Sequence, residues 1–203
     1  MEVQITLTGT SPLIIQSPKL MDPSEELSKQ KAKLTGKRAK DRTDEDTLAI
    51  SQTEFFGSLY YSKELGPYVP GANVLACLRD GAKRARKGKK LLTALLIQKT
   101  EIPLQYQGPR DIDKLWGDRR FRLMKPVRNA GGTGVIRCRP IFHRWSLEVT
   151  ADLDTKEMDL EELQDVAAAA GHFAGLGAWR PSSPKGGQYG RFDAVVRKGL
   201  NGH

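Results

Sequence analysis

The sequence predicts an α+β fold, with a ferredoxin-like (RRM-type) βαββαβ core in a single domain over residues 1–203. Three observations support this fold class. Residues 2–8 alternate between apolar and polar side chains, which is the pattern of a half-buried strand. Residues 73–85 and 159–173 place apolar side chains at helical spacing. Residues 188–198 alternate again and predict a closing strand, which completes the order strand, helix, strand, strand, helix, strand.

A large basic insertion, the arm of residues 11–68, is predicted after the first strand. The stretch from Ser24 to Arg42 has few apolar side chains, so it cannot bury enough surface to offset its ordering entropy. We therefore expect a mobile loop or a solvated hairpin there, followed by a short amphipathic helix or hairpin arm over residues 44–61. A charge run is often only a solvated face. The alternative is sequence-independent phosphate contact, and the residues expected to make it are Lys29, Lys31, Lys33, Lys37, Arg38 and Lys40.

The first helix of the core is expected to start near Asn73, which can cap it. Basic side chains suit the C-terminal end of a helix because the macrodipole is negative there. Six of them lie between residues 83 and 90, which is more than a cap requires. The residues of this helix expected to contact nucleic acid are Arg79, Lys83 and Arg84.

The middle of the chain supplies the second and third strands. Residues 92–106 predict a mostly buried strand, and a second insertion covers residues 107–133 between the two strands. Residues 135–142 and 146–153 both predict strand, with a bend between them.

Arginines at the third strand are candidates for the interface. Arg137 and Arg139 are two residues apart, so they share one face of a strand. Together with Arg144 we expect them to line or flank a groove for a single strand on the open face of the sheet. Ion pairing with the acidic second helix is the competing interpretation.

Composition limits the function classes. The formal net charge is +9 and the pI about 9.6, which favours capture of polyanions. No apolar run approaches the ~20 residues of a membrane-spanning helix, and the N-terminal residues lack the pattern of a signal peptide. Cys77 and Cys138 have no metal-ligand spacing, and we expect neither a metal nor a cofactor. The expected location is the cytoplasm of a bacterial or archaeal cell, with a phage genome as an alternative source.

A glycine-rich segment before the last strand interleaves glycines with aromatic and basic residues. Glycines let a backbone approach a phosphate or a base closely, with N–H groups pointing outward. Flat aromatic side chains offer surfaces on which unpaired bases stack. A surface loop around a buried tryptophan is the competing interpretation. The residues expected to take part are Gly175, Gly177, Trp179, Arg180, Lys185, Gly186, Gly187, Tyr189 and Arg191.

Three segments in this order resemble the RAMP superfamily of CRISPR effector proteins, in particular the Cas7-like backbone subunits. These are residues 8–10 after the first strand, the Pro-Gly turn into the first helix within 68–79, and the glycine-rich segment over 175–180 and 186–192. The resemblance implies a protein that coats single-stranded RNA or DNA as a head-to-tail homo-oligomer or filament. It also implies other CRISPR-type subunits as partners.

The sequence favours a non-catalytic binding protein, with RNA as the preferred strand. A phage single-stranded-DNA-binding or annealing protein is an alternative, and so is an inhibitor that mimics a CRISPR subunit. A RAMP endoribonuclease is a further alternative, since some relatives cut RNA with an aspartate in a region comparable to that of Asp22. His143 and His172 are the histidines that could serve as general acid or base, although His172 falls on the apolar stripe of the second helix.

Overall fold

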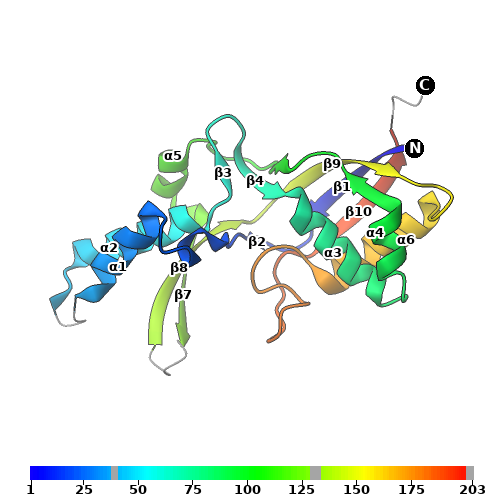
Figure 1. Cartoon of the computed structure of the whole chain (residues 1–203). Coiled ribbons are helices and arrows are strands. Elements are labelled where there is room, and N and C mark those ends of the chain that lie inside the picture. The colour runs from blue at the N-terminus through cyan, green and yellow to red at the C-terminus, as the bar shows by residue number, and fades with distance from the viewer. Residues whose placement is uncertain (38–40, 129–133, 200–203) are drawn as a thin grey trace. The chain divides into compact units, whose positions relative to one another are not determined.

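The computed structural model describes residues 1–37, 41–128 and 134–199 (Figure 1). The chain divides into two compact units. The first contains residues 1–14, 64–107 and 142–203, and the second contains residues 15–63 and 108–141. The second unit therefore draws on both predicted insertions, 11–68 and 107–133.

The first unit contains a four-stranded sheet whose strand order is β10-β1-β9-β5. Its strands are β1 (Glu2–Gly9), β5 (Leu95–Ile97), β9 (Ser146–Leu153) and β10 (Phe192–Lys198), and every pairing is antiparallel. Ile5 at the centre is paired with Val149 on one side and Val196 on the other. The α+β class and its antiparallel sheet are confirmed.

Two helices cover one face of this sheet. They are α3 (Gly71–Lys83) and α6 (Leu160–Ala169) (Figure 1). The two helices pack against each other, and α6 also packs against β10. Beneath them Val3, Ile5 and Leu7 are fully buried, as the alternation of residues 2–8 predicts. The predicted capping box is present, with Asp159 and Glu162 bonded reciprocally to each other's backbone N–H. The expected cap at Asn73 is wrong, because α3 begins at Gly71, directly after the extended Pro70.

The edge strand β10 is held to α6 by the amide of Gln164. Its Nε2 donates to the Ala194 carbonyl at 2.9 Å, and its Oε1 accepts from the Val196 N–H at 2.8 Å. The side chain thus satisfies one acceptor and one donor on the outer side of β10, where no further strand is paired.

Residues 92–106 do not form one long strand. Helix α4 (Gly88–Ala94) runs directly into β5, and β6 (Glu101–Pro103) pairs instead with β4 (Gly66–Pro70). Leu91 and Ala94 are buried side chains of α4, so the apolar residues of this stretch are divided between a helix and a strand. Short apolar runs fit either state, and periodicity alone does not separate them.

The second unit shows that the basic stretch is a helix, so the expected loop or hairpin is wrong. Helix α1 (Glu26–Gly36) packs against α2 (Asp44–Ser58). Leu27, Lys31 and Leu34 are half-buried along one side at helical spacing. Two leucines and the apolar stem of a lysine supply the contact surface that composition alone did not indicate.

The rest of the second unit is built from short elements and a hairpin. They are the 3-10 turns η1 (Pro18–Met21) and η3 (Arg119–Phe121), helix α5 (Ile112–Gly117), and the strands β7 (Arg122–Arg128) and β8 (Gly134–Phe142), which pair antiparallel. Phe55, Phe56 and Trp116 meet edge to face, with centroids 5.4 to 6.3 Å apart. The second unit also contains the two-residue strand β3 (Tyr61–Ser62), whereas the two-residue strand β2 (Leu13–Ile14) belongs to the first unit.

Candidate nucleic-acid interface

The glycine-rich segment of residues 175–191, here called the glycine loop, has a fixed backbone. Gly175, Gly177, Gly186 and Gly190 have φ between 65° and 73°. Gly190 is also tightly enclosed, because a Cβ there would lie 1.8 Å from the Leu176 carbonyl oxygen. Trp179 adopts a φ of 53°, which is unusual for a residue with a side chain.

Backbone hydrogen bonds join the glycine loop to the segment after β1. The Gly190 N–H donates to the Pro12 carbonyl and the Ala178 N–H to the Ile14 carbonyl, both at 2.8 Å. The Cys77 thiol, whose pKa burial raises to about 12, is protonated and donates to the Gly175 carbonyl. The expectation that the loop presents outward N–H groups is therefore wrong for Ala178 and Gly190, whose donors are used inside the protein.

Aromatic and basic side chains lie on this loop. The rings of Trp179 and Tyr189 are both half-buried, and their centroids are 6.2 Å apart at a tilt of 53°. Arg180 turns back on the loop, donating to the Gly177 carbonyl and the Ser182 hydroxyl. Lys185 and Gly186 are exposed, and Gly187 approaches the Trp179 carbonyl. The loop therefore carries two partly accessible rings and an exposed ammonium group.

Much of the charge at the end of α3 is neutralised. Lys83 pairs with Asp80 at 2.7 Å, and Glu162 accepts hydrogen bonds from Lys87 and Lys90 at 2.7 to 2.9 Å. Those bonds lower the pKa of Glu162 to about 2. Part of the basic charge over residues 83–90 is thus neutralised, by one ion pair within α3 and by two that join the start of α4 to α6.

Arg84 and Arg79 are arranged differently. The Arg84 guanidinium lies 3.8 Å above the ring of Phe173, and both side chains are exposed. Arg79 is 3.7 Å from Asp80 and, like Arg191, has a buried Nε with no hydrogen-bond partner among the described residues.

Sequence reasoning placed Phe173 in the core and so missed this pair. Helix α6 continues into η4 (Ala170–Ala174), a π-helical turn closed by the bond from the Gly175 N–H to the Ala170 carbonyl. Phe173 is 45% exposed, and His172, also expected in the core, is exposed as well. His172 lies nine residues after the buried Leu163, which places it on the opposite side of a regular helix.

The open face of the four-stranded sheet does not match the predicted groove. Its described residues carry no aromatic side chain, and the cross-strand register gathers carboxylates there around a single guanidinium. They are Glu2, Glu148, Asp152, Asp193 and Arg197. The Thr6 hydroxyl donates to Glu148 at 3.0 Å. Exposed Leu96 and Val195 share this face, whose charged groups are mostly acidic. Phosphates would be repelled from it.

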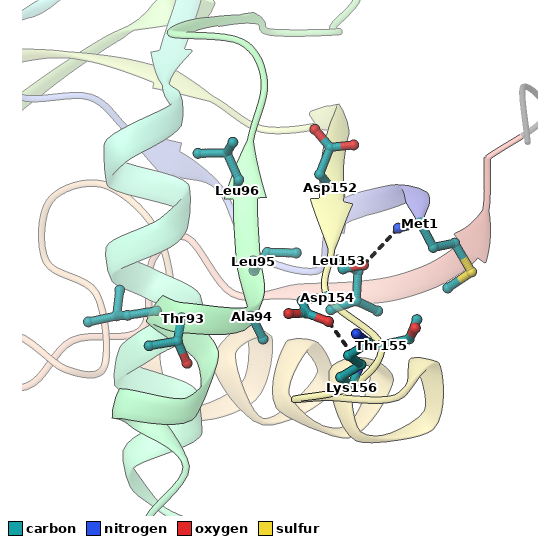
Figure 2. Close-up of a pocket in the computed structure, with 11 residues that line it drawn as sticks. Met1, Thr93, Ala94, Leu95, Leu96, Asp152, Leu153, Asp154, Thr155 and Lys156 are labelled. Carbon is teal, nitrogen blue, oxygen red and sulfur yellow. Dashed lines mark hydrogen bonds between the residues drawn. The ribbon is translucent and has the colours of Figure 1, made fainter.

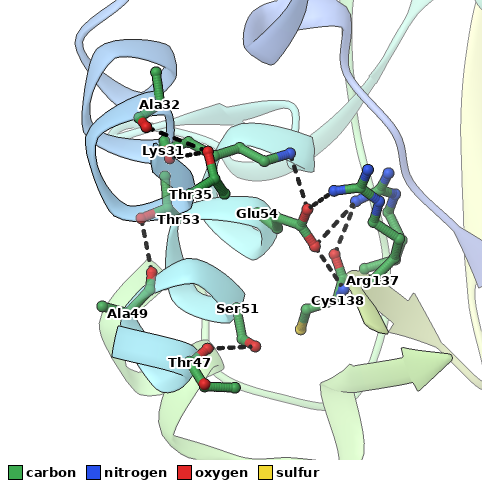
Figure 3. A network of polar contacts seen from close by, with 11 residues as sticks. Lys31, Ala32, Thr35, Thr47, Ala49, Ser51, Thr53, Glu54, Arg137 and Cys138 are labelled. Atoms are coloured by element: carbon green, nitrogen blue, oxygen red, sulfur yellow. Dashed lines mark hydrogen bonds and ion pairs between the residues drawn. The ribbon is translucent and has the colours of Figure 1, made fainter. Parts of the chain in front are cut away.

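Arg137 and Arg139 are not on that face, which corrects their expected placement. Both lie on β8 in the second unit, where they meet the buried carboxylate of Glu54 on α2 (Figure 3). The Glu54 side chain is 1% exposed and also accepts from Lys31 at 2.8 Å and from the Cys138 N–H at 3.0 Å. Ion pairing does involve these arginines, but with Glu54 and not with the second helix of the core.

The electrostatics of this cluster favour the ionised carboxylate. Burial alone would raise the pKa of Glu54, but the hydrogen bonds from Lys31, the Cys138 N–H and Arg137 outweigh it and hold the pKa below its ordinary value. Three cations surround one anion, and the buried Nε atoms of Arg139 and Arg122 have no acceptor among the described residues. The cluster is thus a positively charged node within the second unit.

The remaining predicted residues are dispersed. Lys29 and Lys33 are exposed on α1, and Lys37 pairs with Asp46 at 2.7 Å. Arg38 and Lys40 lie outside the described residues. Arg144 and His143 are exposed in the bend before β9. Asp22 is exposed and accepts from the Ser24 N–H and hydroxyl, bonds that lower its pKa and form a turn.

Cavities open on the first unit, and two of them are defined by their lining residues. One, of about 570 Å³, lies at the ends of β5 and β9 between Met1, Leu92 and Lys156, where the Met1 amino group donates to the Leu153 carbonyl (Figure 2). The other, of about 640 Å³, is lined by Thr10, His172, Arg191 and the first residues of β10. Among the described residues, no three His, Cys, Asp or Glu side chains form a group able to hold a metal ion.

No protein-family model matches the chain, and no curated protein sequence matches it. In the part of the chain that the structure describes, no helix has the length and apolar character needed to cross a membrane.

Proposed function

We propose that this protein binds single-stranded nucleic acid without cutting it, with RNA as the preferred strand, on a ferredoxin-like core of the RAMP type. The core assignment is supported by the strand order β10-β1-β9-β5. Helix α3 lies in sequence between β1 and β5, and α6 lies between β9 and β10. These positions are the ones expected of the proposed βαββαβ core, and they support the assignment.

The observation that carries the proposal is the glycine loop. It carries the half-exposed Trp179 and Tyr189 and the exposed Lys185 on one loop, whose backbone is bonded to residues 12 and 14. Rings beside cations are the combination that binds unpaired strands, because the rings stack on bases and the cations attract phosphates. Bases in a duplex are already stacked and paired, so the loop favours a single strand.

The acidic open face shifts the proposed interface away from the mode typical of RRM domains, in which bases stack on the sheet itself. Support comes instead from the loop and from the surface of α3 and η4, where Arg84 is exposed on Phe173. Exposed Lys29 and Lys33 of the second unit add phosphate contacts that do not depend on sequence. Assembly of several copies head to tail along a strand is part of the same proposal.

A binding experiment on the full chain tests it. Fluorescence anisotropy would compare a single-stranded RNA, a DNA of the same sequence and the corresponding duplex over a salt series. We expect the RNA to bind most tightly, the duplex most weakly, and the logarithm of affinity to fall linearly with that of salt. Equal affinity for duplex and single strand would contradict the proposal, and tighter binding of DNA would contradict the preference for RNA.

A second measurement locates the strand. Trp145 is buried, whereas Trp179 is half-exposed on the loop, so a stacked base should quench Trp179 fluorescence. We expect the quenching to be lost in Trp179→Phe and retained in the control Trp116→Phe, whose tryptophan lies in the second unit. Retained quenching in Trp179→Phe would remove the glycine loop from the interface.

A further inference from the structure

Arg84 and Phe173 form a stacked pair on the surface of the first unit. The Arg84 guanidinium lies 3.8 Å from the centre of the Phe173 ring, and the ring is 45% exposed. The guanidinium carbon thus lies over the ring, while the Arg84 side chain as a whole is exposed. A planar cation supported in this way presents a flat surface on which a base can stack.

His172 connects this pair to a cavity. Its ring meets Phe173 edge to face with centroids 4.5 Å apart, and the same residue lines the cavity of about 640 Å³. That volume lies within the range of small-molecule sites. A continuous surface therefore runs from Arg84 across Phe173 and His172 into the cavity.

The cavity holds donors suited to an anion. Arg191 lines it, and its buried Nε has no acceptor among the described residues. Thr10 and His172 add a hydroxyl and an imidazole to the same wall. Arginine is the side chain best suited to phosphate, because its N–H groups form a planar fork. Asp193 also borders the cavity, but the cross-strand register turns its side chain to the open face of the sheet.

We propose that this surface is a site for one nucleotide, with the base stacked on Arg84 and the phosphate in the cavity beside Arg191, Thr10 and His172. The proposal rests on the proposed function and deepens it, because it assigns base and phosphate to separate groups. It also places a strand contact on the helical side of the sheet, away from the acidic open face.

The probes are adenosine 5′-monophosphate, adenosine and inorganic phosphate, titrated separately into the full chain by calorimetry. We expect the monophosphate to bind more tightly than either fragment. Arg84→Lys keeps the charge but removes the planar surface, so it should weaken monophosphate binding about fivefold or more, the lower end for one stacked base. Phe173→Leu should do the same, and neither should alter the weak binding of phosphate alone.

Two variants act as controls for charge. Arg197→Ala removes a guanidinium from the open face of the same sheet, and it should leave monophosphate affinity unchanged. Asp193→Asn removes a carboxylate from that open face, and it should likewise leave binding of the monophosphate and of phosphate unchanged. Equal binding of phosphate and monophosphate, no detectable binding of either, or equal affinities in wild type, Arg84→Lys and Phe173→Leu would each overturn the nucleotide site.

The same variants are then tested with the single-stranded RNA. If wild type binds it and Arg84→Lys binds equally well, the nucleotide site is wrong while the proposed function stands. If wild type does not bind the RNA, the proposed function is wrong. Displacement of the monophosphate by a polyglutamate peptide at equal charge concentration would identify an acidic protein segment as the occupant and overturn the nucleotide site.

Discussion

The carboxylate of Glu54 lies 2.8 Å from the ammonium of Lys31, and this ion pair joins α1 to α2 inside the second unit (Figure 3). It explains how a stretch rich in lysine becomes a packed helix. The charge that would keep Lys31 in water is met by a carboxylate that is itself buried, and Arg137 and Arg139 approach that carboxylate from β8.

Removal of this carboxylate should destabilise the protein strongly. In Glu54→Gln the three cations lose their common partner, and breaking a buried pair costs about 3–5 kcal/mol. Urea unfolding measures the change, with Glu64→Gln, an exposed site, as the matched control. A loss below about 1 kcal/mol would mean that water replaces the carboxylate and that the cluster is not structural.

The stability of the protein at low pH should depend on the protonation of Glu54. The pKa of Glu54 in the folded protein lies below its ordinary value of 4.5, so its contribution to stability is full above that value. It is lost as the pH falls through the lower folded pKa, because protonation then costs the ion pairs. We expect the free energy of unfolding of wild type to fall more steeply below pH 4.5 than that of Glu54→Gln. Parallel curves would contradict this linkage.

Two glycines of the glycine loop provide a matched pair. Gly186 and Gly190 have nearly the same φ, 65° and 67°, but a Cβ meets nothing within 4 Å at Gly186 and lies 1.8 Å from a carbonyl oxygen at Gly190. Gly186→Ala should cost only the conformational strain of about 1–2 kcal/mol. Gly190→Ala should cost more and should also weaken RNA binding, as thermal unfolding and anisotropy would show. Equal losses would mean that the loop tolerates rearrangement.

Gln164 should protect the edge of the sheet. In Gln164→Ala the Val196 N–H loses its acceptor and the Ala194 carbonyl its donor. At about 0.5–1.5 kcal/mol for each bond, a destabilisation of about 1–3 kcal/mol is expected. Hydrogen exchange should accelerate at Val196 more than at its neighbour Val195. Unchanged exchange at Val196 would show that β10 does not depend on this amide.

Lys29 and Lys33 test the contribution of α1 to strand binding. The double variant Lys29→Gln, Lys33→Gln should weaken binding of RNA and of DNA alike and reduce the salt slope by about 1.4, at about 0.7 for each phosphate contact. The control is Lys63→Gln with Lys156→Gln, which removes the same charge from exposed positions elsewhere. An equal loss in the control would assign the effect to net charge.

Regular alternation and helical spacing predicted most of the first unit. Val3, Ile5 and Leu7 are buried as expected, and Asp159 and Glu162 form the expected cap. The density of charge in the sequence did not predict the structure of the basic stretch, because it does not show which acidic groups lie opposite the lysines in the folded protein. The partner of Lys31 is Glu54, 23 positions later in the chain, and that of Arg137 is the same residue on another element.

The candidate site was predictable only in part. The glycines and aromatic residues of the loop were identified from their interleaving, but which N–H groups they present depends on bonds to Pro12 and Ile14, which are distant in sequence. The face of the sheet was misjudged because Glu148 and Asp193 share it only through the cross-strand register with Thr6 and Thr8.

The π-helical turn at Ala170–Ala174 makes the surface chemistry depend on chain length. Deleting Ala169 would rotate the residues that follow it by about 100° relative to those that precede it, which would separate Phe173 from Arg84 with every residue proposed to touch a ligand still present. A comparison of the site residues of this variant with those of wild type would find no difference between them. The identity of the ligand-facing side chains is therefore set by the number of residues in α6 and η4 together as much as by their kind.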